Sequence, residues 1–213
     1  MDNLGNKRLS YEQDFLNRED LKTDPIDQFA QWFSDADQAG VVEPNAMALA
    51  TVSPDSKPSV RIVLLKGFAA EGFAFYTNYE SNKAREMAEN PNASLVFWWD
   101  KLQRQVRIKG KVEKLDRSYS EQYFQSRPRG SQLSAWASPQ SRSMTREELE
   151  RRRMETEERF KDIDPIPLPE HWGGYLLRPE KLEFWQGRAN RYHDRFEYKI
   201  DENGNWQIAR LAP

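Results

Sequence analysis

The residues with the clearest chemistry lie near the C-terminus of the chain. Phe184-Trp185-Gln186-Gly187 is followed, after a short loop, by Arg191-Tyr192-His193-Asp194-Arg195, and His193 is one of only two histidines. Guanidinium groups clamp phosphate or stack on rings, and an imidazole exchanges a proton near neutral pH. This segment therefore predicts a site for a planar, anionic ligand with redox or proton chemistry.

Three earlier segments carry groups that bind phosphate. Arg61 and Lys66 bracket an apolar run, and their odd separation would point them to opposite faces of an ideal strand. Tyr76-Thr77-Asn78 precedes Ser81-Asn82-Lys83 at an expected helix N-terminus, where free N–H groups favour anions. Tyr123 and Arg127 lie one helical turn apart and Ser131 follows them, so a second phosphate could bind there.

Each of these segments also has a plain structural interpretation. The charges could be strand ends, an ordinary N-cap and a helix terminus with favourable basic residues. Trp185 and Gln105 suit a flat heteroaromatic ring, although each alone is more typical of a structural residue. Neither histidine has metal-ligand spacing, and the chain has no cysteine, which excludes disulfides, thiolate metal sites and a cysteine nucleophile.

The elements that must position these residues are mostly strands. Asp24-Pro25 opens a helix, and an Asn203-Gly204 turn predicts a hairpin before the final strand. Short sequential strands with helices outside the run predict a mainly β, α+β fold built on a small, mostly antiparallel barrel. The expected strands are 46–52, 60–66, 73–78, 93–99, 103–115, 174–177, 181–186, 196–200 and 206–211, and the expected further helices are 83–89, 117–125, 132–137 and 145–160.

The length and composition of the chain indicate its domain organisation and the kind of partner that it binds. The 213 residues show no linker, so we expect a flexible N-terminal arm over residues 1–23 and a single domain over residues 24–213. An apolar content of 38% with 12% aromatic residues favours a thin core completed by a partner subunit. A net charge of −2 argues against a general nucleic-acid binder. The polar N-terminus and the absence of an apolar span predict a cytoplasmic protein.

From about Asp24 to Pro213 the chain resembles the pyridoxamine/pyridoxine 5′-phosphate oxidase family of FMN-dependent enzymes. The resemblance rests on many ordered matches. They are Arg61 to Lys66, Phe75-Tyr76-Thr77-Asn78, Arg104-Gln105-Val106, Tyr123-Phe124, Ser126-Arg127-Pro128-Arg129, Ser131-Gln132, Ala135-Trp136, Gln140-Ser141, Trp172-Gly173-Gly174, Phe184-Trp185-Gln186-Gly187, His193-Asp194-Arg195-Phe196 and Arg210-Leu211-Ala212-Pro213.

The resemblance implies a split-barrel, FMN-binding homodimer with both active sites at the subunit interface. It implies that FMN is bound by Arg61, Ile62, Val63, Leu64, Leu65, Lys66, Tyr76, Thr77, Lys83, Gln105, Gln140, Ser141, Trp185 and Arg195. It implies that Lys66, Tyr123, Arg127 and Ser131 hold the substrate phosphate, that Arg191 and His193 act on the pyridine ring, and that Arg8 and Tyr11 of the arm close over the substrate.

The implied reaction is oxidation of pyridoxine 5′-phosphate and pyridoxamine 5′-phosphate to pyridoxal 5′-phosphate, with hydride transfer to FMN N5 and reoxidation by dioxygen to hydrogen peroxide. Two departures stand out: Asn82 replaces the usual arginine, and Tyr192 replaces the usual leucine. We expect the first to weaken FMN retention. A flavin- or heme-binding relative without oxidase activity, and a nucleic-acid-binding barrel, are the alternatives.

Overall fold

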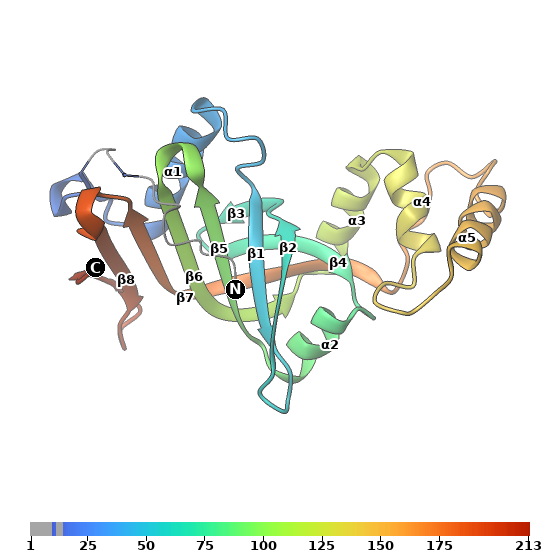
Figure 1. Ribbon diagram of the computed structural model, residues 1–213. Helices are drawn as coiled ribbons and strands as arrows, with labels where there is room; N and C mark the ends of the chain where they lie inside the picture. Colours follow the sequence, from blue (N-terminus) through green and yellow to red (C-terminus); the bar gives the residue numbers. More distant parts are fainter. Residues whose placement is uncertain (1–9, 12–14) are drawn as a thin grey trace, which may run out of the picture.

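One curled sheet organises the chain. The computed structural model describes residues 10–11 and 15–213. Nine strands of the described part form a sheet in the order β2-β1-β5-β6-β7-β4-β3, with β8 pairing with β7 and β9 pairing with β8 (Figure 1). The strands are β1 (Ala46–Val52), β2 (Pro58–Leu64), β3 (Gly67–Ala69), β4 (Gly72–Asn78), β5 (Asn92–Trp99), β6 (Arg104–Lys114), β7 (Trp172–Gln186), β8 (Asp194–Ile200) and β9 (Trp206–Leu211). All the pairings are antiparallel, which confirms the predicted fold class.

Helices flank this sheet at both ends (Figure 1). The α-helices are α1 (Pro25–Gln38), α2 (Asn82–Glu89), α3 (Arg117–Ser126), α4 (Arg129–Ala137) and α5 (Arg146–Arg159), and short 3₁₀ turns cover Arg18–Asp20, Asp100–Leu102 and Ala189–Arg191. None of the helices in the described ranges is long and apolar enough to cross a membrane.

Helix α1 forms where the sequence predicts it and closes the main core. The Asp24 side chain accepts a hydrogen bond from the Ile26 N–H at 2.7 Å, and Pro25 occupies the first helical position. Phe29 is fully buried and meets Phe73 edge-on, with ring centroids 5.0 Å apart. This aromatic packing fixes α1 against the inner face of the sheet.

Strand β7 corrects one expectation from the sequence. The strands predicted at 174–177 and 181–186 form one continuous strand of 15 residues, in spite of Pro179 between them. A register shift between Lys109 and Gly110 of β6 accommodates the irregularity, and a Cβ on Gly110 would lie only 1.9 Å from the carbonyl oxygen of Arg178. Residues 172–177 pair with β4, and residues 181–186 pair with β8.

A second, smaller core forms where α3, α4 and the chain before β7 meet. Phe124, Phe160 and Ile166 are fully or almost fully buried there and pack with Trp172. Helix α4 begins at Arg129, directly after Pro128, and not at Gln132 as expected. Both cores lie along one sheet, and we propose that residues 24–213 form a single domain.

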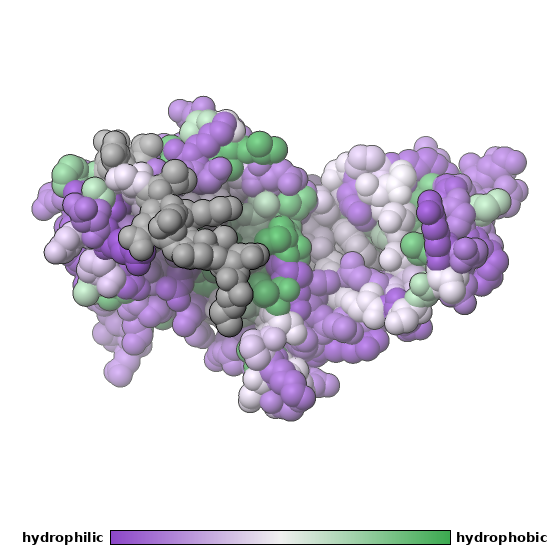
Figure 2. All heavy atoms as spheres, in the orientation of Figure 1, coloured by the Kyte–Doolittle hydropathy of each residue, from purple (hydrophilic) through white to green (hydrophobic). Residues whose placement is uncertain are grey.

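The outer face of β2 and β5 leaves large apolar side chains uncovered. Val60, Ile62 and Trp98 are 70%, 68% and 47% exposed, respectively. Figure 2 shows hydrophobic side chains gathered on the front of the molecule, where β1 and β2 cross it in Figure 1. An exposed apolar area of this kind is typical of a surface that another protein covers.

Candidate active site

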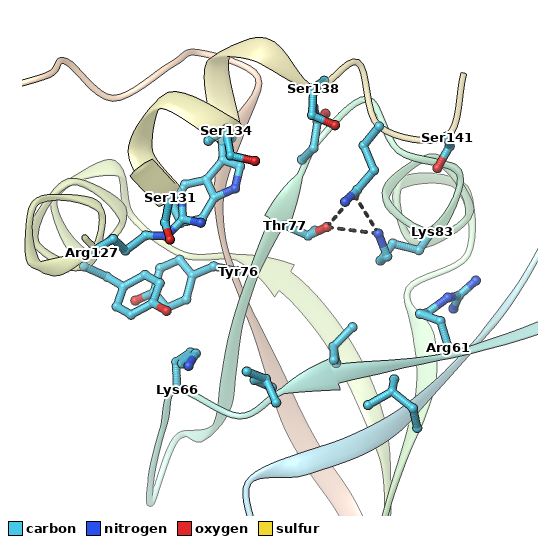
Figure 3. Close-up of a pocket in the computed structure, with 18 of the residues that line it drawn as sticks. Arg61, Lys66, Tyr76, Thr77, Lys83, Arg127, Ser131, Ser134, Ser138 and Ser141 are labelled. Carbon is cyan, nitrogen blue, oxygen red and sulfur yellow. Dashed lines mark hydrogen bonds between the residues drawn. The ribbon is translucent and has the colours of Figure 1, made fainter. Parts of the chain in front are cut away.

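A cavity of about 860 Å³ lies between β2, β4 and the helices α2 to α4. Figure 3 shows its two polar ends, with Arg61 and Lys83 at one and Lys66, Arg127 and Ser131 at the other. Its lining includes most of the residues predicted for FMN and substrate phosphate. They are Arg61, Ile62, Val63, Leu64, Lys66, Tyr76, Thr77, Lys83, Tyr123, Arg127, Ser131, Gln140 and Ser141.

The first polar end carries Arg61 and Lys83. The Lys83 ammonium donates to Thr77 Oγ1 at 3.0 Å and to Gln140 Oε1 at 2.8 Å. Burial and the nearby Arg61 guanidinium lower the pKa of Lys83 to about 8. Because an anion beside these two groups would relieve their repulsion, this end suits a phosphate.

Glu86 of α2 holds Arg61 at this end. Glu86 forms an ion pair with Arg61 Nη2 at 3.3 Å and accepts a hydrogen bond from the Ser59 hydroxyl at 2.9 Å. Burial opposes its ionisation, but hydrogen bonds from Thr51, Ser59 and Arg61 lower the pKa of Glu86 below its usual value. No sequence motif predicted a role for this carboxylate, which lies one helical turn after Lys83 in α2.

The second polar end is walled by aromatic rings. Tyr76 and Tyr123 stack with centroids 4.0 Å apart, and Trp172 lies parallel to Tyr76 at 5.6 Å. The Arg127 guanidinium lies 4.6 Å from the centre of the Trp172 ring. Among the described residues, its Nη1 atom is buried and has no hydrogen-bond partner. An unpaired buried donor is costly, so this group is arranged for an acceptor that a ligand brings.

Lys66 lies at the second polar end of the cavity. The odd separation of Arg61 and Lys66 predicted opposite faces of one ideal strand, and so did not predict that both would line one cavity. Strand β2 ends at Leu64, so the alternation of faces does not extend to Lys66, and both Arg61 and Lys66 line one cavity. Leu65, predicted to contact FMN, is 4% exposed and belongs to the main core, and it does not line the cavity.

A separate group of rings surrounds the end of β7. Trp185 and His193 lie 4.5 Å apart, and Tyr11 meets Trp185 edge-on at 6.0 Å. Gln105 and Arg195 lie opposite Trp185 on the neighbouring strands β6 and β8. We call Tyr11, Gln105, Trp185, His193 and Arg195 the ring cluster. None of them lines the cavity.

His193 has a defined hydrogen-bonding role in the ring cluster. Its Nδ1 accepts the backbone N–H of Arg188 at 3.1 Å, so a neutral ring carries its proton on Nε2. Burial and the nearby Arg191 lower the pKa of His193, which favours that neutral form. Asp194, adjacent in sequence, bonds instead to Arg188 at 2.8 Å and Arg210 at 2.7 Å.

Arg191 precedes the ring cluster in an exposed turn. Asn190 and Arg191 both have positive φ, at 54° and 61°. This left-handed conformation is unfavourable for residues other than glycine and clusters at functional sites. Arg8, the other residue predicted in the arm, lies outside the described residues.

The cavity and the ring cluster lie at opposite ends of β7. Trp172 at its start lines the cavity, and Trp185 near its end belongs to the ring cluster. Trp185 lies thirteen residues after Trp172, which corresponds to roughly 40 Å of extended strand at about 3.3 Å per residue. One small ligand therefore cannot contact Arg127 and His193 of the same chain.

The chain matches two protein-family models, which together cover most of its length. Residues 33–159 match the family model described as pyridoxamine 5′-phosphate oxidase, and residues 172–213 match the pyridoxine 5′-phosphate oxidase C-terminal dimerisation region. The chain belongs to the pyridoxine/pyridoxamine 5′-phosphate oxidase family. It is an FMN-dependent oxidoreductase and forms a homodimer, as the resemblance in the sequence implied.

Relatives in this family match along the whole chain. The pyridoxine/pyridoxamine 5′-phosphate oxidase of Salinibacter ruber is 51% identical, with 100% of both chains covered. The enzyme of the same name from Bordetella pertussis is 52% identical, with 97% of both chains covered.

Solved structures confirm the split-barrel fold. PhzG from Burkholderia lata 383, in complex with tetrahydrophenazine-1-carboxylic acid, is 31% identical with a TM-score of 0.88, covering 95% of this chain and 100% of that one. An FMN-binding protein related to pyridoxamine 5′-phosphate oxidase, from Nostoc punctiforme, is 18% identical with a TM-score of 0.73, covering 91% of this chain and 100% of that one. The second likeness concerns the fold alone.

The residues present fit the FMN of this family. The cavity offers cations at its first polar end and apolar strand residues beside them, which suits a phosphate attached to a flat ring system. No role was assigned to Trp172 from the sequence, although the glycine two residues after it, Gly174, indicates a close approach of the backbone to a neighbouring group. A Cβ on Gly174 would lie 2.8 Å from the Tyr76 ring, so only glycine leaves room for the aromatic wall.

Proposed function

We propose that the chain oxidises pyridoxine 5′-phosphate and pyridoxamine 5′-phosphate to pyridoxal 5′-phosphate, with FMN as cofactor and dioxygen as final acceptor. The observation that carries this proposal is one cavity with two separate cationic ends. Two such ends suit two phosphorylated ligands, one at each end. The names and the full-length similarity of the curated relatives support the same reaction.

The first polar end would hold the FMN phosphate through Arg61 and Lys83. Thr77, Gln140 and Ser141 border this end and offer hydroxyl and amide groups. When bound, FMN supplies a hydride acceptor at N5 that dioxygen restores, with release of hydrogen peroxide. The apolar residues Ile62, Val63 and Leu64 would exclude water from one side of the ring system.

The second polar end would hold the substrate phosphate. Lys66, Arg127 and the hydroxyls of Tyr123 and Ser131 line it together. The unpaired Nη1 of Arg127 is the donor that a phosphate oxygen would satisfy. Binding the substrate at its phosphate fixes the position of its reacting carbon, which is an orientation effect.

The ring cluster would come from the partner subunit. Gln105, Trp185 and Arg195 would then complete the flavin site, and Arg191 and His193 would lie over the pyridine ring. Neutral His193 offers its Nε2 proton as a hydrogen-bond donor to the substrate, because Nδ1 is already occupied by Arg188. Tyr11 packs against this cluster and would close over the substrate.

Relatedness to PhzG supplies a second candidate, oxidation of a reduced tricyclic acid. That structure has a TM-score of 0.88 and contains tetrahydrophenazine-1-carboxylic acid, which has no phosphate. Two features favour the phosphorylated substrate in this chain. The substrate end gathers four phosphate-binding side chains, and the curated relatives are 51% and 52% identical against 31% for PhzG.

The test is an anaerobic titration of the FMN-loaded protein with pyridoxine 5′-phosphate, monitored by the absorbance of oxidised flavin. We expect bleaching that air reverses, with formation of pyridoxal 5′-phosphate. A parallel titration with unphosphorylated pyridoxine should bleach far less at equal concentration. Flavin that stays oxidised with the phosphate ester, or that responds equally to both compounds, would contradict the proposal.

A further inference from the structure

A buried carboxylate lies beside the ring cluster without a role in the reaction described above. Glu183 is 4% exposed and lies on β7, two residues before Trp185. Its Oε2 accepts from Arg107 Nη1 at 3.2 Å, and its Oε1 accepts from Arg195 Nε at 3.0 Å. A buried carboxylate is costly unless it is paired, so these two bonds fix three side chains together.

The side chain of Arg195 is held by hydrogen bonds at two of its three guanidinium nitrogens, Nε and Nη1. Its Nη1 donates to the carbonyl of Ala212 at 2.7 Å, near the C-terminus. Among the described residues, no acceptor is bonded to its Nη2. Arg195 also lies opposite Trp185 in the register of β7 and β8. The guanidinium is therefore fixed by its Nε and Nη1 groups, while Nη2 has no bonded acceptor within the described part of the chain.

We infer that Glu183 is a positioning residue for cofactor binding, which acts by fixing the guanidinium of Arg195. The inference rests on the proposed function, in which Arg195 contacts FMN across the dimer. A planar guanidinium binds a ligand best when its orientation is set beforehand, because less side-chain freedom is then lost on binding. Glu183 also separates the positive charges of Arg107 and Arg195 from each other.

Glu197 provides a matched control. It lies opposite Glu183 on β8, is half-buried, and forms an ion pair with Lys181 and not with Arg195. Replacement of either glutamate by glutamine removes one carboxylate from the same face of the sheet at nearly constant volume. A general effect of lost charge or of sheet stability would appear in both variants.

The experiment measures the FMN dissociation constant by quenching of flavin fluorescence, with the purified dimer. We expect Glu183→Gln to weaken FMN binding about tenfold, which is within the range of coupling energies between contacting side chains. We expect Glu197→Gln to change the FMN dissociation constant less than about twofold. Both changes are then repeated in an Arg195→Ala background. There, Glu183→Gln should have no further effect, because the group that it positions is gone.

Two results would overturn the inference: equal FMN affinities for Glu183→Gln and Glu197→Gln, or the same loss from Glu183→Gln with and without Arg195. If Glu183→Gln does not fold, Glu183→Asp takes its place in the same cycle, because it keeps the charge but shortens the reach to Arg195. A wild-type chain that binds no FMN would refute the proposed function itself. A wild-type chain that binds FMN tightly, beside an unaffected Glu183 variant, would refute this inference alone.

Discussion

We expect Lys83 to couple the binding of a phosphate to the uptake of a proton. Burial and Arg61 hold its pKa near 8 in the chain without ligand, whereas a bound phosphate dianion would raise that pKa. FMN binding would then be accompanied by proton uptake above pH 8. The affinity is therefore full below pH 8 and falls as the pH rises, by at most about tenfold per pH unit.

We expect the FMN dissociation constant to increase between pH 7 and pH 9.5 in the wild-type chain. Lys83→Arg should flatten this dependence, because a guanidinium stays charged throughout the range. Flavin fluorescence quenching at each pH measures both. A wild-type profile as flat as that of Lys83→Arg would show that Lys83 does not titrate on binding.

Asn82 stands at the first polar end of the cavity, where the family usually has a positively charged arginine. Its side chain is exposed and lines the cavity near Lys83. We expect Asn82→Arg to tighten FMN binding about threefold to tenfold, since an added cation would face a phosphate in a partly solvated position. Ala88→Arg is the control, because it adds the same charge to an exposed position of α2 away from the cavity. An equal gain in both variants would point to overall charge rather than to a specific contact.

The three segments with phosphate-binding side chains were singled out from residue types alone, and the structure brings side chains of all three to one cavity. Glu86 and Glu183 were not predicted. Each acts by holding an arginine from another element, and a sequence without a structure does not show which strand or helix faces it.

At the scale of elements, the aromatic wall of the cavity depends on a close approach between β7 and β4. Gly174 pairs with Tyr76 across these strands, and a Cβ on Gly174 would lie 2.7 Å from a Leu115 methyl group and 2.8 Å from the Tyr76 ring. We expect Gly174→Ala to lower the free energy of unfolding by about 1–3 kcal/mol through overpacking. It should also weaken substrate binding, because Tyr76 stacks on Tyr123.

Gly130→Ala is the matched control for this change. It lies in α4 with nothing within 4 Å of an added Cβ. It should raise the free energy of unfolding by up to about 1 kcal/mol through helix propensity. Urea unfolding followed by circular dichroism measures both variants. Equal stability of the two would contradict the packing argument.

Most elements were predicted within a few residues, because their patterns are local. The 3.6-residue spacing of α1 and the alternation in β6 are such patterns. The continuity of β7 was missed because Pro179 is typical of a strand end, whereas the pairing with β6 that continues past the extra residue Glu180 involves residues far away in sequence. The start of α4 was missed because Arg129 and Gly130 show no apolar periodicity.

At the scale of the whole molecule, a homodimer with a composite site makes a specific prediction. Arg127 lines the cavity, and Arg191 adjoins the ring cluster. We expect Arg127→Ala and Arg191→Ala homodimers each to lose most of their turnover, with FMN affinity much less affected in Arg191→Ala. A heterodimer with one copy of each would contain one site with both changes and one site with neither.

Subunit exchange between the two inactive variants should therefore restore activity. Random pairing makes half of the dimers mixed, so recovery should approach about a quarter of wild-type turnover. Steady-state formation of pyridoxal 5′-phosphate after denaturation and joint refolding measures this. No recovery, with exchange verified by differently tagged subunits, would mean that Arg127 and Arg191 serve the same site from one chain.

The continuous β7 strand has a further consequence for the proposed dimer. In that dimer, its first residues would border the substrate end of one site, and its last residues would carry the tryptophan that serves the other. Each chain would thus extend a single strand between the two reaction centres of the dimer. A distortion in the middle of β7 would misplace residues in both centres at once, so the two sites share their geometry even where each binds its own ligands.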